Sequence, residues 1–288
     1  MIEVPGGRVW CEAVGSRTDR PPLLCLHGGP GLPSAYLDTL RGLADERQVV
    51  LYDQLGCGRS DRPSSRDLYR AERFVEEVAC VREGMGLERF HLLGQSWGGM
   101  LAVMFALTRP PGLVSLILAS PVIDASRWVA DCNRLKAQLP EEIRRTIDEH
   151  EAHGFTGCPE YAAATLEWWR RHVCRIAPFP AEVERAWQGL GAECYETMWG
   201  PSEFTCSGNL KDVALSSRLA EIDVPTLFTC GRHDEATPQS TGEFAQLVAR
   251  ARLVVFEASS HMAHLEEAEA YLACVREFLG HAERASSR

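Results

Sequence analysis

The stretch GQSWG, at residues 94–98, has the residue types and spacing of a serine nucleophile. It matches G-x-S-x-G, follows the apolar run 90–93 and precedes the apolar run 100–107. The motif requires such a strand–turn–helix context, because its serine lies in a tight, strained turn. An incidental serine in a glycine-rich turn is the alternative interpretation. The context favours Ser96 as a nucleophile.

A serine nucleophile needs a base, and the base needs an orienting acid. In this strand–turn–helix architecture the three follow the chain order Ser, Asp or Glu, His. A late apolar run leads into GRHDEATP, which supplies Asp234. The next leads into EASSHMAHLEE, which supplies His261 and His264. We predict Asp234 as the acid and His261, the histidine nearer its strand, as the base. His264 is interpreted as a surface or capping residue, and His233 would reverse the chain order.

Acyl transfer also needs hydrogen-bond donors for the oxyanion that develops on the substrate carbonyl. The backbone N–H of Trp97 is one candidate, and the loop HGGPG at 27–31 should supply the second, because glycines let the backbone approach a substrate. The phosphate-binding patterns GxGxxG and GxxxxGK are both absent. His27 is interpreted as structural. Asp53, in DQLGCGRS, could rival Asp234, but it precedes the serine and is interpreted as part of a supporting loop.

The elements that must position these residues are short buried strands alternating with helices. The apolar runs are continuous, which suits a parallel sheet covered on both faces; they span 22–29, 48–56, 90–96, 113–121, 225–234 and 251–261. Strands alternating with helical patterns predict an α/β protein with a doubly wound, mostly parallel sheet. In such sheets ligands bind beyond the carboxyl ends of the strands.

Residues 122–212 interrupt this alternation with helical patterns and no obvious strand. The stripe of Trp128, Cys132, Leu135 and Leu139 is one such pattern. Five of the seven tryptophans lie in this segment, which marks it as distinct from the rest of the chain. We therefore predict a helical cap at 122–212, inserted into a core formed by 1–121 and 213–288.

Composition narrows the classes of partner and compartment. The net charge is −10, and no basic run is present, so we expect no nucleic-acid and no membrane partner. An acidic surface weakly favours cationic substrates. Eleven cysteines without a CxxC pair predict a reducing, cytoplasmic compartment rather than a disulfide framework. The N-terminal residues MIEVPGGRVW lack the pattern of a signal peptide.

Taken together, these motifs resemble the proline iminopeptidases, the prolyl aminopeptidase branch of the α/β-hydrolase fold. The resemblance spans nearly the whole chain and is weakest in the cap; it rests on HGGPG (27–31), DQLGCGRS (53–60), GQSWGGML (94–101), GPSEFTCSGNLKD (200–212), GRHDEATP (231–238) and SSHMAHLEE (259–267). It implies an α/β-hydrolase fold with an inserted helical cap, and a serine hydrolase that cleaves the amide bond after a free N-terminal residue, preferably proline.

The resemblance also implies roles for particular residues. The triad would be Ser96, Asp234 and His261, and the oxyanion would be bound by the backbone amides of Gly29 and Trp97. Glu203 and Glu235 match the acidic residues that bind the α-amino group of the substrate. Without the motif, Glu203 would be interpreted as a solvated cap residue and Glu235 as a turn residue.

The pocket for the first substrate residue is expected to include Trp199 and Phe204, which flank Glu203, with Tyr195 as a further candidate. No metal and no organic cofactor is implied. The expected partner is a small peptide or aminoacyl amide with a free amino group. An amidase, esterase or lactonase acting on another small or biosynthetic substrate would use the same triad, and a non-catalytic ligand receptor is a more remote alternative. The sequence does not predict the oligomeric state.

Overall fold

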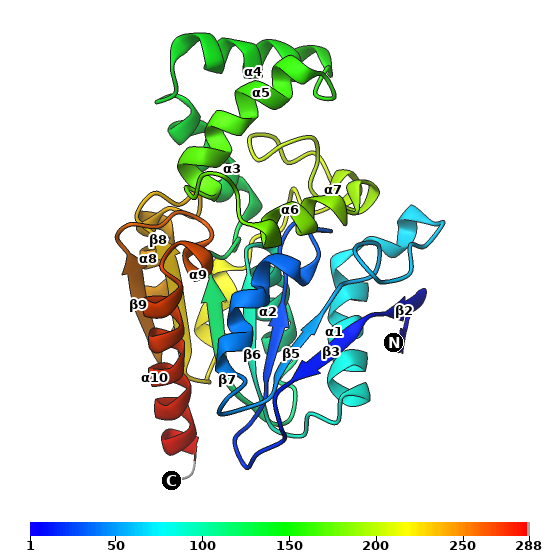
Figure 1. The fold of residues 1–288 in the computed structure, drawn as a ribbon, viewed down its shortest axis with the longest axis vertical. Coiled ribbons are helices and arrows are strands. Elements are labelled where there is room, and N and C mark those ends of the chain that lie inside the picture. Colours follow the sequence, from blue (N-terminus) through cyan, green and yellow to red (C-terminus); the bar gives the residue numbers. More distant parts are fainter. Residues whose placement is uncertain (287–288) are drawn as a thin grey trace.

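The structure, a computed structural model, describes residues 1–286, whose centre is a seven-stranded sheet (Figure 1). The strand order is β3-β5-β4-β6-β7-β8-β9, and all neighbours are parallel except β3 with β5. The strands are β3 (Cys11–Val14), β4 (Leu23–Leu26), β5 (Val49–Tyr52), β6 (Phe90–Gln95), β7 (Leu113–Ala119), β8 (Thr226–Gly231) and β9 (Ala251–Phe256). The predicted mostly parallel α/β sheet is confirmed.

The continuous apolar runs form strands because both faces of the sheet are covered. Every residue of β4, β5, β6 and β8 is buried, whereas in the edge strand β9 only Phe256 is buried and the other residues are exposed or half-buried. Three short N-terminal strands were not predicted from the sequence. They are the edge strand β3 and a hairpin of β1 (Ile2–Val4) and β2 (Gly7–Val9), all too short for a clear pattern.

Helices cover the two faces of the sheet. The 3₁₀ helix η1 (Ser34–Leu43) packs on β5, on α9 (Ala263–Glu266) and on α10 (Ala268–Ser286). The helices α1 (Ala71–Gly84) and α2 (Trp97–Leu107) pack together, and α8 (Pro238–Gln246) lies on β8 and β9. Short 3₁₀ turns form η2 (Arg66–Leu68) and η4 (Ser216–Glu221). Of the helices in residues 1–286, none has both the length and the apolar character that a membrane span requires.

The chain between β7 and β8 is helical and lies above the carboxyl ends of the strands (Figure 1). It comprises α3 (Ala125–Lys136), α4 (Glu141–His153), α5 (Pro159–Trp168), the π-helical turn η3 (Trp169–Val173), α6 (Ala181–Gln188) and α7 (Ala192–Met198). Pro159 opens α5, where its missing N–H costs no hydrogen bond. The division of the chain into a cap at 122–212 and a core stays a prediction, and "cap" denotes these residues below.

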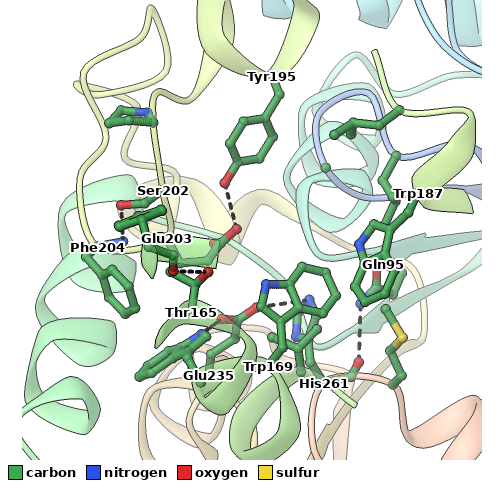
Figure 2. A pocket seen from close by; sticks show the side chains of 18 residues that line it. Gln95, Thr165, Trp169, Trp187, Tyr195, Ser202, Glu203, Phe204, Glu235 and His261 are labelled. Carbon is green, nitrogen blue, oxygen red and sulfur yellow. Dashed lines mark hydrogen bonds and ion pairs between the residues drawn. The ribbon is translucent and has the colours of Figure 1, made fainter. Parts of the chain in front are cut away.

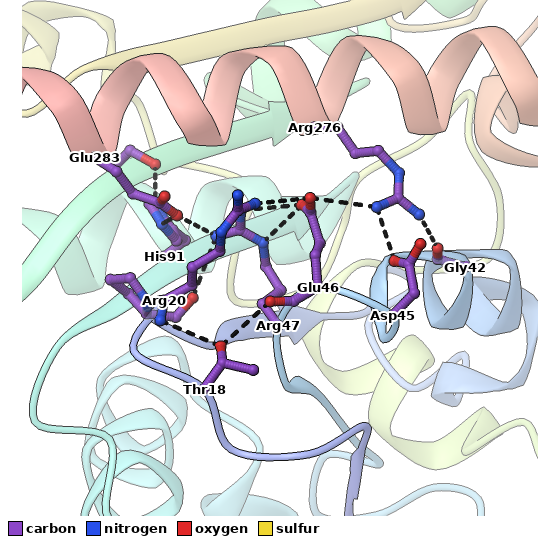
Figure 3. Close-up of polar contacts among 11 residues, drawn as sticks. Thr18, Arg20, Gly42, Asp45, Glu46, Arg47, His91, Arg276 and Glu283 are labelled. Atoms are coloured by element: carbon purple, nitrogen blue, oxygen red, sulfur yellow. Dashed lines mark hydrogen bonds and ion pairs between the residues drawn. The ribbon is translucent and has the colours of Figure 1, made fainter.

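A buried polar network ties α10 to the base of the sheet (Figure 3). The guanidinium of Arg47 has no exposed surface and is paired with both Glu46 and Glu283. His91, on β6, contacts the same Glu283 carboxylate through Nε2 at 3.3 Å. Arg276 pairs with Asp45 at 2.8 Å. The last helix is therefore held by charged contacts as well as by its apolar face.

Candidate active site

Ser96 stands in a strained turn between β6 and α2. Its φ of 58° and ψ of −121° lie outside the regions that L-residues usually occupy. The flanking glycines permit this turn, because a Cβ on Gly94 would lie 2.0 Å from the Gly98 carbonyl oxygen. A Cβ on Gly98 would lie 2.3 Å from the carbonyl oxygen of Leu26 on β4. The G-x-S-x-G motif thus has the tight strand–turn–helix geometry that its spacing predicts.

Asp234 and His261 meet at the carboxyl ends of β8 and β9. Oδ1 of Asp234 lies 2.8 Å from Nδ1 of His261. The same carboxylate accepts hydrogen bonds from the hydroxyl of Ser120 and from the backbone N–H groups of Gly231 and Ala236. These donors fix the carboxylate, so one oxygen faces the imidazole and leaves Nε2 for another partner. His264, by contrast, is buried and its Nε2 contacts the carbonyl of Tyr36 at 3.0 Å, so it is not a surface residue.

The loop HGGPG lies against the turn that carries Ser96. A Cβ on Gly28 would lie 2.9 Å from the Cβ of Ser96, so only glycine allows this approach. The N–H of Gly28 is used internally, since it donates to the hydroxyl of Tyr36 at 2.6 Å. Within residues 1–286 no acceptor is found for the N–H of Gly29, and the N–H of Trp97, first in α2, has no acceptor in its own helix. Both predicted oxyanion donors are thus available.

Two buried residues connect three of the four segments that carry the predicted triad and oxyanion donors, namely those after β4, β6 and β9. The hydroxyl of Tyr36, which accepts from Gly28, donates to Oε1 of Gln95 at 2.6 Å. Nε2 of Gln95 in turn donates to the carbonyl of His261 at 3.3 Å. Both side chains are at most 2% exposed, so water does not compete for these bonds. Neither residue was predicted; only the adjacency of Gln95 to Ser96 could have indicated it.

Gln54 makes a second connection between the same loops. Its side chain accepts from Nε1 of Trp97 at 2.9 Å and donates to the carbonyl of His27 at 2.9 Å. Its backbone N–H donates to Nε2 of His27 at 2.8 Å. Burial lowers the pKa of His27 to about 4, so this histidine is neutral and serves as an acceptor. His27 is therefore placed as the structural interpretation expects.

Asp53, the alternative acid, is occupied by its own loop. Its carboxylate accepts from the backbone N–H and hydroxyl of Ser34 and from the guanidinium of Arg59. Burial by itself opposes ionisation, but the Arg59 and Ser34 contacts lower the pKa of Asp53 below its ordinary value. The carboxylate makes no contact with His261 among the described interactions. This geometry fits a supporting loop.

A cavity of about 230 Å³ opens beside His261 between the sheet and the cap (Figure 2). Glu203 and Glu235 line it, and Oε1 of Glu235 lies 3.8 Å from Nε2 of His261. Hydrogen bonds orient both carboxylates: Tyr195 and Trp128 donate to Glu203, and Trp168 donates to Glu235. The cap thus supplies one carboxylate and the donors that hold both.

The environment of these two carboxylates disfavours their charged forms. Burial raises the pKa of Glu203. Burial also raises the pKa of Glu235 well above its ordinary value, and the neighbouring carboxylates of Glu203 and Asp234 raise it further. A cation placed between the carboxylates would offset both the burial and the repulsion. The arrangement is therefore chemically suited to bind a cation such as an ammonium group.

The aromatic residues of the cap are only partly where the sequence places them. Phe204 and Tyr195 line the cavity as expected. The prediction for Trp199 is wrong, because Trp199 is buried and is not among the residues that line the cavity. It packs edge-on against Trp128 and donates its Nε1–H to the carbonyl of Ser202. The tryptophans that donate to the carboxylates are Trp128 and Trp168 instead, alongside Tyr195. The helical stripes identified Trp128 as buried but not its direction.

A group of possible metal ligands lies elsewhere in the cap. His150, Cys158 and Glu160 have ligand atoms within 4.8 Å of one another, at the junction of α4 and α5. None of the three lines the cavity. This group is therefore separate from the cavity beside His261.

Comparison with known proteins places this geometry in a class. The family profile of the alpha/beta hydrolase fold matches residues 21–268, so the chain belongs to the α/β hydrolases. Proline iminopeptidase from Heyndrickxia coagulans is 43% identical over 280 residues, which is 97% of each chain. Within the α/β hydrolases, the chain belongs to the proline iminopeptidase family, which confirms the resemblance seen in the motifs.

Solved structures agree with this assignment. The crystal structure of proline iminopeptidase from Mycobacterium smegmatis matches with a TM-score of 0.91 at 37% identity, covering 99% of this chain and 98% of that one. The structure of VinJ matches with a TM-score of 0.94 at 36% identity, covering 98% and 97%. Both similarities include the cap, where the motif resemblance was weakest.

Proposed function

We propose that this protein is a serine hydrolase that removes an unblocked N-terminal residue, preferably proline, from a small peptide or aminoacyl amide. The proposal is supported by the Asp234–His261 hydrogen bond of 2.8 Å, beside a cavity lined by two carboxylates. Relatives named proline iminopeptidase support the preference for proline. Ser96, Asp234 and His261 form the proposed triad.

In the proposed mechanism, Oγ of Ser96 attacks the substrate carbonyl while Nε2 of His261 takes the hydroxyl proton. Asp234 holds Nδ1–H of His261 and stabilises the imidazolium. The amides of Gly29 and Trp97 donate to the developing oxyanion. His261 then gives its proton to the leaving amine as the carbon–nitrogen bond breaks. His261 next takes a proton from a water molecule, whose oxygen attacks the acyl-enzyme carbonyl. The proton passes to Oγ of Ser96 as the ester bond breaks, which frees the amino acid and Ser96.

Glu203 and Glu235 are proposed to bind the α-amino group of the substrate. A secondary ammonium donates two hydrogen bonds, and the cavity offers two carboxylates for them. An N-acetylated substrate carries no charge and would leave both carboxylates unpaired. The site therefore selects a free N-terminus in two ways. It binds the ammonium group, and it disfavours a blocked substrate that leaves its carboxylates unpaired.

The decisive experiment compares prolyl-p-nitroanilide with N-acetyl-prolyl-p-nitroanilide, using the wild-type protein and Ser96→Ala. We expect the wild type to cleave only the free amine, and Ser96→Ala to lose at least about 10⁴-fold in kcat/KM. Ser64→Ala, an exposed serine, is the matched control and should retain wild-type activity. Turnover by Ser96→Ala would exclude Ser96 as the nucleophile, and equal cleavage of the acetylated substrate would exclude the role of the carboxylates.

The compartment proposed from composition is the cytoplasm. All eleven cysteines are free thiols in the structure. Burial raises the pKa of Cys57 and Cys132 well above the ordinary value, so these thiols stay protonated and unreactive as parts of the core. Buried free thiols of this kind support a reducing environment.

A further inference from the structure

The cavity beside His261 has two chemically different ends. Figure 2 shows Glu203 and Glu235 on one side of the view and Trp187 with Gln95 on the other, with Trp169 between them. Leu32, Trp187 and Leu190 are among the lining residues, and Leu32 is joined to the HGGPG loop because its N–H donates to the carbonyl of Gly28. Within the described chain, the lining residues include no lysine or arginine and no carboxylate besides the glutamate pair. The second end is therefore uncharged, and apart from the amide of Gln95 the side chains named there are apolar.

The apolar end is built onto the oxyanion loop. Leu190 lies two residues after the end of α6, and the next residue, Gly191, donates its N–H to the carbonyl of Gly31 at 2.9 Å. Gly189 accepts from the N–H of Gly58 at 2.9 Å. These contacts fix the end of α6, which carries Trp187, against the loop that holds the substrate carbonyl in the proposed mechanism.

Trp187 is held in place while part of its surface stays open. Its indole packs edge-on against Trp169, with ring centroids 4.8 Å apart, and against Phe179 at 5.0 Å. The residue is half-buried rather than fully covered. A rigid, partly exposed indole favours binding of an apolar or aromatic group of a ligand, because the side chain loses little conformational freedom when the ligand packs on it.

The covalent structure of proline indicates which part of the substrate lies at each end of the cavity. The side chain of proline closes on its own nitrogen, so the ring and the ammonium occupy the same end of the cavity, near Glu203 and Glu235. The carbonyl carbon lies at Ser96. The remaining substituent of that carbon is the amine component that leaves, and the end of the cavity away from the glutamates is free to receive it.

We propose that Leu32, Trp187 and Leu190 form a leaving-group subsite that binds an apolar or aromatic second residue, or an arylamine. This proposal rests on the proposed function and specifies its substrate class. The bond from carbonyl carbon to nitrogen breaks after His261 protonates that nitrogen, and the released amine departs past Trp187. A second residue with a carboxylate side chain finds no partner there.

The test uses substrates that share proline and differ only in the leaving amine: Pro-Phe-amide, Pro-Asp-amide, Pro-Gly-amide and prolinamide. We expect the wild type to cleave Pro-Phe-amide with a kcat/KM about tenfold or more above Pro-Gly-amide, with Pro-Asp-amide lowest. In Trp187→Ala, the loss for Pro-Phe-amide should exceed the loss for prolinamide by about tenfold. Trp187→Phe should recover most of the difference, because it restores an aromatic face.

Phe155→Ala removes an aromatic residue of the cap that is 66% exposed and outside the cavity, and it should match the wild type on all four substrates. If circular dichroism shows that Trp187→Ala is unfolded, Leu190→Ala serves as the second variant. Equal losses on all four substrates, or a wild type that does not discriminate among them, would overturn the subsite while leaving the proposed function intact. Failure of the wild type to cleave any prolyl substrate would overturn both.

Discussion

At the scale of single residues, the glutamate pair shows how a functional residue can oppose the stability of the fold. Glu235 is 3% exposed and lies near Glu203 and Asp234, so its charge is costly in the absence of a cation. Its hydrogen bond from Trp168 at 3.0 Å orients the carboxylate without neutralising it. Binding an ammonium would remove this cost, so affinity for a cation and instability without one have the same origin.

Glu235→Gln should therefore stabilise the ligand-free protein at neutral pH while it lowers activity. The folded-state pKa of Glu235 is raised, so its charge costs stability increasingly as the pH rises above the ordinary value of 4.5. We expect the variant to gain about 1–3 kcal/mol in free energy of unfolding at pH 8 and nearly nothing at pH 4. Urea unfolding at both pH values measures this. Destabilisation at pH 8 would contradict it, and Glu142→Gln, on the cap surface, is the control.

Tyr36→Phe should affect turnover more than substrate binding. The change removes the hydroxyl that joins Gly28 to Gln95 and leaves two buried polar groups unpaired. We expect kcat to fall by about 10- to 100-fold with little change in KM, because a displaced oxyanion loop no longer fits the transition state. Steady-state kinetics with a prolyl amide provide the measurement. Tyr271→Phe, a buried tyrosine on α10, should alter stability without this loss of kcat; an equal loss there would refute the positioning role.

At the scale of elements, the proposed chemistry lies on loops at the carboxyl ends of the strands. The turn after β6, the segments after β8 and β9 and the loop after β4 converge because parallel strands end at one edge of the sheet. Hydrogen bonds through Gln54, Gln95 and Tyr36 join the segments after β4, β6 and β9, and the Asp234–His261 contact joins the segment after β8 to them. At the opposite end of the sheet, the network around Arg47 anchors α10.

Glu283→Gln should weaken the attachment of α10 in a pH-dependent manner. Burial alone would raise the pKa of Glu283, but hydrogen bonds from His91 and Arg47 lower it from 4.5 to about 2. A lowered folded-state pKa contributes stability above about pH 4.5 that is lost as the pH falls toward 2. We expect a cost of about 2 kcal/mol at pH 7, because the buried Arg47 loses one of its two carboxylate partners, and a smaller cost at pH 3.5.

Chemical denaturation at pH 7, 5 and 3.5 checks this expectation. Glu277 lies on the same helix as Glu283 and forms an exposed ion pair with Arg252 of β9. Glu277→Gln breaks that pair and should have little effect at any of these pH values. A difference between Glu283→Gln and the wild type that stays constant with pH would mean that the charge of Glu283 does not anchor α10.

At the scale of the whole molecule, the proposed binding site belongs to neither part of the chain alone. Glu203 comes from the cap, whereas Glu235 comes from the loop after β8. The cap also contacts the core through the carbonyl of His172, which accepts from the backbone N–H groups of Glu235 and His261. A cation bound by both carboxylates would therefore join the cap to the sheet.

Pyrrolidine, the charged ring of proline without its carbonyl, should raise the melting temperature of the whole chain. A ligand at 100 times its Kd adds about 2.7 kcal/mol, which corresponds to a rise of several degrees for a chain of this size. We expect a single transition and a larger rise at pH 8 than at pH 4.5, where the carboxyls bind protons. Differential scanning calorimetry provides the measurement, with cyclopentanol as the uncharged control. An equal rise with cyclopentanol would show that the charge is not recognised.

Local patterns in the sequence already predict the sheet and the residues of the proposed triad. The continuous apolar runs match β4 to β9, and the glycines around Ser96 predict the tight turn that the structure contains. Asp234 and His261 could be chosen because each follows a strand in the required chain order. These features depend on a few consecutive residues, which is why they can be read without knowing the tertiary contacts.

Only the tertiary structure decided which side chains surround the chemistry. Helical periodicity tells that a cap residue is buried, but not against what, so Trp199 was misplaced and the contacts of Trp128 with Glu203 were missed. Tyr36 lies 59 residues before Gln95, and no local pattern connects them. The sequence by itself determined the strands and the reactive residues that follow them. The packing of distant helices decided where the carboxylates, the indoles and the bridging hydroxyl point, because those directions depend on contacts between segments far apart in the chain.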